Sequence, residues 1–102
     1  MKISIEPHFQ ISMPNNIVLF TLNGCDHCVN LKKRLSKLSI PYKEIETTEN
    51  EVLWDKIVEE TGHDLLPTTL IMNDENDESF IYIPGVDYQT EDEIVEIIKS
   101  YT

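Results

Sequence analysis

Two cysteines stand three positions apart in the segment Cys25-Asp26-His27-Cys28, and the chain contains no others. A thiolate attacks a disulfide, and a second thiol nearby can resolve the mixed disulfide that forms. Three residues of helix rise about 4.5 Å along the axis, which suits the Cα separation that a disulfide requires. The spacing therefore indicates thiol–disulfide exchange, with Cys25 as the nucleophile and Cys28 as the resolving thiol.

The surroundings of Cys25 favour its thiolate form. The pair follows a continuous apolar run and is predicted to begin a helix, whose free N–H groups and dipole stabilise a thiolate. His27 adds to this effect when it is protonated, whereas the charge of Asp26 opposes it. We expect the dipole and His27 to outweigh Asp26 and to hold the pKa of Cys25 below about 8.5, the value of a free cysteine.

Two other uses of a cysteine pair remain as alternatives. Half of a zinc site is one, since His8, His27 and His63 are available, but there is no second C-x-x-C and no H-x₃₋₅-H. A purely structural disulfide is the other, and it is uncommon in a cytosolic chain. We therefore predict a catalytic pair, with no metal site and no permanently bound cofactor.

Length and charge limit the remaining function classes. The chain has 102 residues and a formal net charge of −11 at pH 7, which indicates one domain and repels phosphate backbones and anionic lipids. We expect a monomer that binds neither nucleic acid nor membrane. Residues 1–7 lack the apolar run of a signal peptide, and no segment has the length of a membrane span. The expected location is the cytoplasm.

Hydrophobic patterning predicts an α/β domain of four strands and three helices. The strands are expected at residues 17–20, 42–46, 68–72 and 80–83, with a polar hairpin connection at 73–78. The helices are expected from Cys25 or Asp26 to about Ser39, from a capping box at Thr48–Glu51 to Gly62, and from a capping box at Thr90–Glu93. The strand–helix–strand units imply parallel pairing at the centre, and the last hairpin implies an antiparallel edge.

The first sixteen residues differ in pattern from the rest. Apolar and polar side chains alternate strictly from residue 3 to 13, which indicates an extended segment with one buried face. We predict an N-terminal extension at 1–16 that adds a strand or hairpin to the sheet edge, and a main domain at 17–102. The apolar side chains available to that strand are Ile3, Ile5, Phe9, Ile11 and Met13.

The chain resembles the glutaredoxins of the thioredoxin-fold superfamily. The resemblance rests on Val18-Leu19-Phe20 before the cysteine pair, on Thr61-Gly62 followed by Leu66-Pro67-Thr68, and on Ile83-Pro84-Gly85-Val86-Asp87 before the last helix. It implies a thioredoxin-like fold, with a four-stranded mixed sheet flanked by three helices. It also implies an enzyme of electron transport and cell redox homeostasis.

The same resemblance implies roles for residues outside the cysteine pair. Pro67 is expected to be cis and to face Cys25, where it modulates the thiolate, and the backbone of Leu66 is expected to pair with the substrate. Gly85, Val86, Asp87 and Tyr88 are expected to form the site for the γ-glutamyl end of glutathione. The chain departs from the family at two positions: Leu22 stands where many glutaredoxins have Lys, and Asp64 where they often have Arg.

The expected function is reduction of protein disulfides or glutathione mixed disulfides by dithiol exchange. Glutathione is the candidate reductant, and we predict that it binds weakly because the cations usually present at positions 22 and 64 are missing. Two alternatives remain. The chain could be a carrier that binds an iron–sulfur cluster through Cys25 and glutathione, or a thioredoxin-like protein that receives electrons from a reductase.

Overall fold

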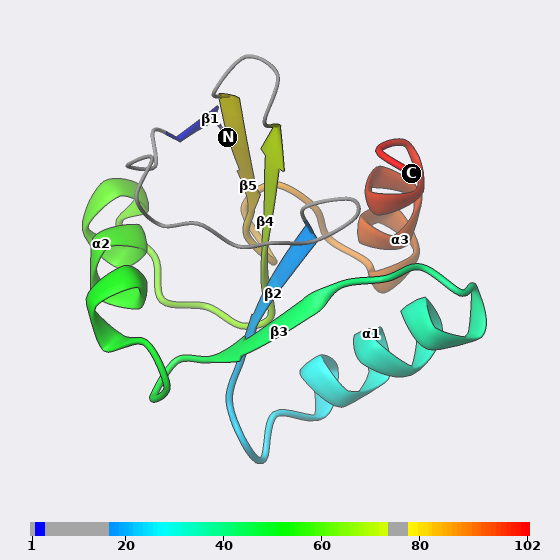
Figure 1. Cartoon of the computed structure of the whole chain (residues 1–102), viewed down its shortest axis with the longest axis horizontal. Coiled ribbons are helices and arrows are strands. Elements are labelled where there is room, and N and C mark those ends of the chain that lie inside the picture. The colour runs from blue at the N-terminus through cyan, green and yellow to red at the C-terminus, as the bar shows by residue number, and fades with distance from the viewer. Residues whose placement is uncertain (1, 4–16, 74–77) are drawn as a thin grey trace.

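The computed structural model describes residues 2–3, 17–73 and 78–102. The four strands of the main domain are β2 (Ile17–Thr21), β3 (Lys43–Glu46), β4 (Thr68–Asn73) and β5 (Glu78–Tyr82). The helices are α1 (Asp26–Lys37), α2 (Glu51–Thr61) and α3 (Glu91–Lys99). This β-α-β-α-β-β-α order and the mixed sheet confirm the predicted thioredoxin-like α/β fold (Figure 1).

The sheet has the strand order β1-β5-β4-β2-β3. β2 and β3 are parallel, whereas β4 pairs antiparallel with both β2 and β5. At the edge, the two-residue strand β1 (Lys2–Ile3) pairs antiparallel with β5, which agrees with the predicted edge strand. The other apolar residues of the predicted extension, Ile5, Phe9, Ile11 and Met13, lie outside the described residues, as do 74–77 of the hairpin connection.

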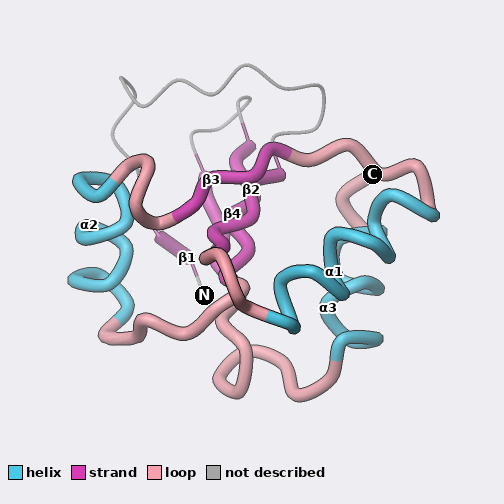
Figure 2. Tube along the Cα trace, turned by 90° about the horizontal axis from the view of Figure 1, so that it is seen from below, coloured by secondary structure: helices cyan, strands magenta, loops and turns pink. Residues whose placement is uncertain are grey.

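Helices cover both faces of the sheet, with α2 on one side and α1 and α3 on the other (Figure 2). β2 is buried on both faces because its successive side chains point in opposite directions. Ile17 and Leu19 pack in the cluster that contains the α1 and α3 side chains, whereas Val18 and Phe20 pack in the cluster that contains α2. The continuous apolar run before the cysteines is thus an interior strand, β2, which leads into the turn before Cys25.

Helix ends agree with the sequence at two places and differ at a third. Gly62 ends α2 in the left-handed conformation, and Thr90 and Glu93 form the predicted capping box of α3. The capping box predicted at Thr48–Glu51 was wrong: the N-cap of α2 is Asn50, whose side chain accepts a hydrogen bond from the Leu53 N–H. A short polar Asn meets the same requirement two residues later, which moves the start of the helix to Glu51.

Candidate active site

Cys25 is the N-cap of α1. Its backbone is extended, at φ −88° and ψ 107°, and its Sγ atom accepts a hydrogen bond of 3.1 Å from the Cys28 N–H. The Cys25 N–H in turn donates to the Leu22 carbonyl, which closes the turn between β2 and α1. The sulfur of Cys25 therefore caps the helix, which begins at the cysteine pair as the sequence predicted. A thiolate at this atom lies at the positive end of the helix dipole.

The two sulfurs are joined in a disulfide, and the Cα atoms of Cys25 and Cys28 are 5.2 Å apart. Cys28 is 1% exposed, whereas Cys25 is partly exposed at the start of the helix. Cys25 is therefore the more accessible of the two cysteines. It is open to an incoming thiol or disulfide, whereas Cys28 is shielded from one.

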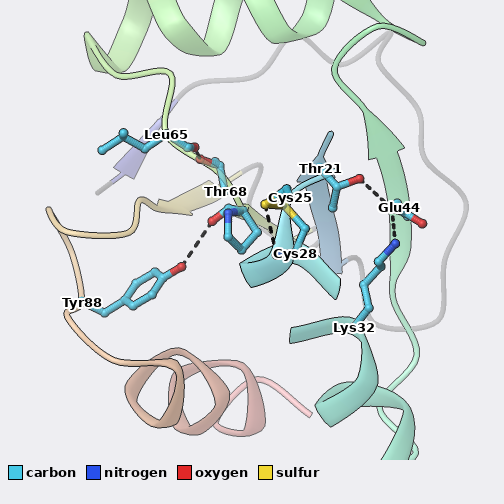
Figure 3. Close-up of a disulfide and its surroundings, with 9 residues drawn as sticks. Thr21, Cys25, Cys28, Lys32, Glu44, Leu65, Thr68 and Tyr88 are labelled. Atoms are coloured by element: carbon cyan, nitrogen blue, oxygen red, sulfur yellow. Dashed lines mark hydrogen bonds and ion pairs between the residues drawn. A yellow bond between two sulfur atoms is a disulfide. The ribbon is translucent and has the colours of Figure 1, made fainter. Parts of the chain in front are cut away.

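The loop before β4 carries the predicted cis proline, and the Leu66–Pro67 peptide bond is cis. Pro67 is buried, and its carbonyl accepts a hydrogen bond of 3.2 Å from the buried hydroxyl of Tyr88 (Figure 3). On the other side of the proline, the Thr68 hydroxyl donates to the Leu65 carbonyl at 2.6 Å. Burial raises the pKa of Tyr88, so its hydroxyl keeps the proton that it donates.

A groove with a volume of about 420 Å³ lies beside the cysteine pair. It brings together four of the predicted site residues: His27, Leu66, Pro67 and Tyr88. The remaining lining comes from α1, from Pro84 and from the start of α3: Asn30, Leu31, Pro84, Gln89, Thr90, Glu91 and Ile94. The groove therefore runs from the residue before Cys28, past the cis proline, to the first turn of α3.

Gly85, Val86 and Asp87 form the turn next to this groove and are not among its lining residues. The Asp87 carboxylate accepts a hydrogen bond of 2.8 Å from the Ile83 N–H, and the Asp87 N–H donates back to the Ile83 carbonyl. Gly85 has a φ of 80°, which suits glycine at this turn. Asp26 is exposed on the first turn of α1. The expected role of the 85–87 turn in binding glutathione stays a prediction.

A polar network on the other side of the cysteines was not predicted. The Glu44 carboxylate on β3 accepts a hydrogen bond of 2.6 Å from the Thr21 hydroxyl and one of 2.8 Å from the Lys32 ammonium group (Figure 3). These contacts lower the pKa of Glu44 and raise that of Lys32. Thr21 ends β2 and Lys32 lies one turn after Cys28, so Glu44 ties the end of the strand to the helix.

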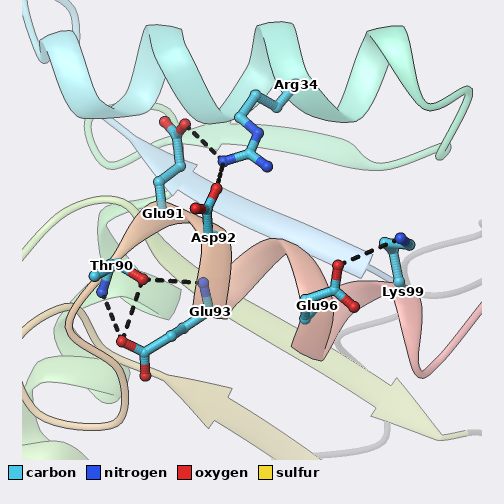
Figure 4. Close-up of polar contacts among 7 residues, drawn as sticks. All are labelled: Arg34, Thr90, Glu91, Asp92, Glu93, Glu96 and Lys99. Carbon is cyan, nitrogen blue, oxygen red and sulfur yellow. Dashed lines mark hydrogen bonds and ion pairs between the residues drawn. The ribbon is translucent and has the colours of Figure 1, made fainter.

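A second polar network joins the helices on the groove side. The Arg34 guanidinium group on α1 contacts Glu91 at 3.1 Å and Asp92 at 2.5 Å, and both carboxylates belong to the first turn of α3 (Figure 4). In that turn, Thr90 Oγ1 accepts from the Glu93 N–H and the Glu93 carboxylate accepts from the Thr90 N–H. Side chains of the protein itself therefore occupy the start of α3.

The segment from β2 to the end of β4 has a match among known protein families. Residues 17–75, more than half of the chain, match the glutaredoxin family model. The chain belongs to the glutaredoxin family. The match includes the cysteine pair and the Leu66–Pro67 bond of this glutaredoxin, and it ends before the 84–88 turn. A search of curated proteins found no significant match.

Family membership and the Cys25–Cys28 pair together support thiol–disulfide oxidoreductase chemistry for this glutaredoxin. Among the described residues, no three His, Cys, Asp or Glu side chains lie close enough to hold a metal ion together. Within the same residues, no helix has both the length and the apolar character needed to cross a membrane.

Proposed function

We propose that this glutaredoxin is a cytoplasmic enzyme that reduces protein disulfides by dithiol exchange, in preference to glutathione mixed disulfides. The observation that carries the proposal is the unequal exposure of a cysteine pair at a helix N-terminus. Cys25 caps α1 and is accessible, while Cys28 is 1% exposed and 5.2 Å away between Cα atoms. This arrangement supports Cys25 as the sulfur that attacks the substrate and Cys28 as the sulfur that releases it.

The reaction moves two electrons from the enzyme to the substrate. The Cys25 thiolate attacks one sulfur of the substrate disulfide, forms a mixed disulfide and releases the other substrate sulfur as a thiolate, which takes a proton from solvent. Cys28 then loses its proton and attacks Cys25, which frees the second substrate thiol and leaves the Cys25–Cys28 disulfide. An external thiol reductant returns the pair to the dithiol form.

Three features support a protein substrate over glutathione. Leu22 is 43% exposed and Asp64 is exposed, so neither supplies a cation for the carboxylates of glutathione. Asp87 uses its carboxylate to hold the Ile83 N–H, and the capping box of α3 uses the Thr90 and Glu93 N–H groups. A peptide can instead pair with the backbone of Leu66, which lines the groove and needs no charge to do so.

The test uses enzyme that is reduced beforehand and freed of reductant, mixed with a peptide that contains one disulfide. We expect the wild type to lose both of its thiols in a single turnover as the peptide gains two. Cys28→Ser should stop at a mixed disulfide between Cys25 and the peptide, visible by mass spectrometry. Trapping by Cys25→Ser in place of Cys28→Ser would reverse the assignment of the nucleophile, and no reaction by the wild type would overturn the function.

The iron–sulfur carrier is a separate outcome that purification itself would reveal. A carrier that binds a cluster through Cys25 absorbs visible light when freshly isolated without oxygen. We expect a colourless protein, because the proposed dithiol chemistry uses Cys25 together with Cys28. A brown protein whose colour disappears in Cys25→Ser would support the carrier in its place.

A further inference from the structure

The cations of this acidic protein are concentrated in one part of the chain. Five of its eight Lys and Arg residues lie within 27–43, a stretch that contains no Asp or Glu, while the whole chain carries −11. This stretch contains most of α1 and the start of β3. One segment next to the cysteine pair is therefore strongly basic in a protein that is otherwise acidic.

The structure separates the cations of α1 by their partners. Arg34 points toward α3 and contacts Glu91 and Asp92, and Lys32 contacts Glu44 on β3 (Figures 3 and 4). Lys33 and Lys37 are exposed and form no ion pair with any residue that the structure describes. These two ammonium groups are therefore available to a charged partner.

Both lysines line a shallow groove between α1 and β3, with a volume of about 450 Å³. We call it the α1–β3 groove, and its residues are Val29, Lys32, Lys33, Ser36, Lys37, Tyr42 and Glu44. Val29, which lines the groove, lies one helical turn after Cys25, and its N–H donates to the Cys25 carbonyl at 3.1 Å. Val29 is 41% exposed, so the groove presents an apolar side chain as well as the lysines.

The α1–β3 groove is distinct from the groove beside the cis proline. In Figure 3, Lys32 and Glu44 lie on one side of the cysteine pair and Tyr88 lies on the other. The cis-proline groove contains Glu91 and no Lys or Arg, whereas the α1–β3 groove contains three lysines and one carboxylate. Glu91 is paired with Arg34, whereas Lys33 and Lys37 form no ion pair with a described residue. A substrate that reaches Cys25 therefore meets unpaired positive charge on the α1–β3 side.

We propose that the α1–β3 groove docks an acidic segment of the protein whose disulfide Cys25 reduces; this rests on the function proposed above. An acidic enzyme repels acidic proteins over most of its surface, and a local basic groove converts that repulsion into an oriented approach. Lys33 and Lys37 hold the acidic segment, and Val29 contacts the residues between that segment and the disulfide. The groove thereby selects among protein disulfides by the charge of their flanking residues.

The test compares peptides that share one disulfide loop and differ only in a flanking tail of four Glu, four Ser or four Lys residues. At low salt, the reduced wild type should react with the Glu-tailed peptide about tenfold faster than with the Ser-tailed one. High salt should remove most of the difference, because it screens exposed charges. The Lys33→Glu/Lys37→Glu variant should prefer the Lys-tailed peptide and should retain the wild-type rate with the Ser-tailed one.

The control is Lys56→Glu/Lys99→Glu, which makes the same change in net charge on α2 and α3. It should retain the preference for the Glu tail, so an equal loss of preference in both variants would overturn the docking site and indicate an effect of total charge. A wild type that reacts equally with all three tails would overturn it as well.

A binding measurement keeps docking separate from catalysis. Oxidised wild type should bind a Glu-tailed peptide with S-methylated cysteines more tightly than the matching Ser-tailed peptide, with chemical shift changes at Lys33 and Lys37. Binding without exchange by the reduced enzyme would refute the proposed function and support the docking site. Exchange without this binding preference would support the proposed function and refute the docking site. Displacement of the Glu tail by an equal concentration of a single-stranded oligonucleotide would assign the groove to nucleic acid instead.

Discussion

The N-termini of α1 and α3 face the same groove and are closed in different ways. At α1 the cap is the sulfur of Cys25, which accepts one hydrogen bond from the Cys28 N–H. At α3 the cap is the complete box of Thr90 and Glu93, with Glu91 and Asp92 in the same turn and Arg34 across from them. The positive end of α1 thus faces a sulfur that can react, whereas the N–H groups at the start of α3 are hydrogen-bonded by the Thr90 and Glu93 side chains.

This difference determines which anion each helix can stabilise. The positive end of a helix favours negative charge within its first turn, and a carboxylate of the same chain uses that effect as well as a ligand does. The N-terminus of α3 therefore stabilises carboxylates of the protein itself, and this leaves little stabilisation for the carboxylate of a ligand. α1 has one carboxylate in its first turn, Asp26, and its cap atom is the Cys25 sulfur, so the end of this helix favours the Cys25 thiolate.

The largest effect is expected from Cys25→Ser at the N-terminus of α1, because this change separates the chemical role of the cap from its structural role. Serine is a strong N-cap, so its oxygen can accept from the Cys28 N–H in place of sulfur. Single-turnover disulfide reduction should fall to the limit of detection. In denaturant, the free energy of unfolding of the reduced variant should equal that of the reduced wild type or exceed it by up to ~1 kcal/mol. A clear loss of stability would show that α1 depends on the sulfur for its structure.

The next test restores cations near Cys25 with Leu22→Lys and Asp64→Arg. A charge-assisted hydrogen bond contributes about 1.5–3 kcal/mol when sheltered from water, and less at partly exposed positions such as these. We expect the double variant to bind glutathione about tenfold more tightly and to remove glutathione from a mixed disulfide faster. The control for total charge adds Lys56→Glu on α2 to the same background, which removes two of the three added charges and should leave the tighter binding in place. Robust glutathione turnover by the unmodified enzyme would contradict the prediction.

A smaller effect is expected from Thr90→Ala, which opens the cap of α3. Loss of an N-cap hydroxyl costs about 1 kcal/mol of folding stability. Denaturant unfolding should show that loss, while the rate of disulfide exchange at Cys25 should stay within twofold of the wild type. Thr90→Ser is the matched control and should retain both properties. A large fall in the exchange rate of Thr90→Ala would show that the two N-termini are coupled.

The smallest effect is expected from Glu44→Gln, and it depends on pH. Thr21 and Lys32 lower the pKa of Glu44 from its ordinary value of 4.5, so its contribution to stability is present above that value and is lost as the pH falls through the lowered pKa. We expect wild type to exceed the variant by about 0.5 kcal/mol at neutral pH, because both partners are partly exposed. Melting temperatures measured from pH 7 down to pH 3 should converge, and a constant difference would contradict the assignment.

Local patterns predicted most of the architecture and the position of the cysteine pair. The apolar run at 17–20, the cysteine spacing and the capping residues Thr90 and Glu93 each act over a few residues. The structure has the strand, the disulfide at the start of the helix and the capping box at these positions. The error at Thr48 arose because Thr48 and Asn50 are both good N-caps, and spacing alone does not choose between them. The family resemblance correctly predicted the cis bond before Pro67.

The networks around the site could not be predicted, because they depend on pairing between distant segments. Glu44 reaches Thr21 and Lys32 only because β3 lies beside β2 in parallel register, with Leu19 opposite Glu44. Arg34 reaches Glu91 across 57 positions of sequence. The one available signal was that Lys32, Lys33, Arg34 and Lys37 share a single helix in an acidic chain, and the sequence did not show which of them are paired.

The short distance between Cys25 and Cys28 also affects how the protein withstands oxidative damage. Peroxide would oxidise the accessible Cys25 thiolate to a sulfenic acid, whose further oxidation to a sulfinic acid is irreversible for most proteins. With Cys28 5.2 Å away between Cα atoms, the sulfenic acid can condense with that thiol, releasing water and forming the same disulfide that ordinary turnover produces. An oxidative lesion at this position is thereby converted into a catalytic intermediate that the enzyme's reductant can repair.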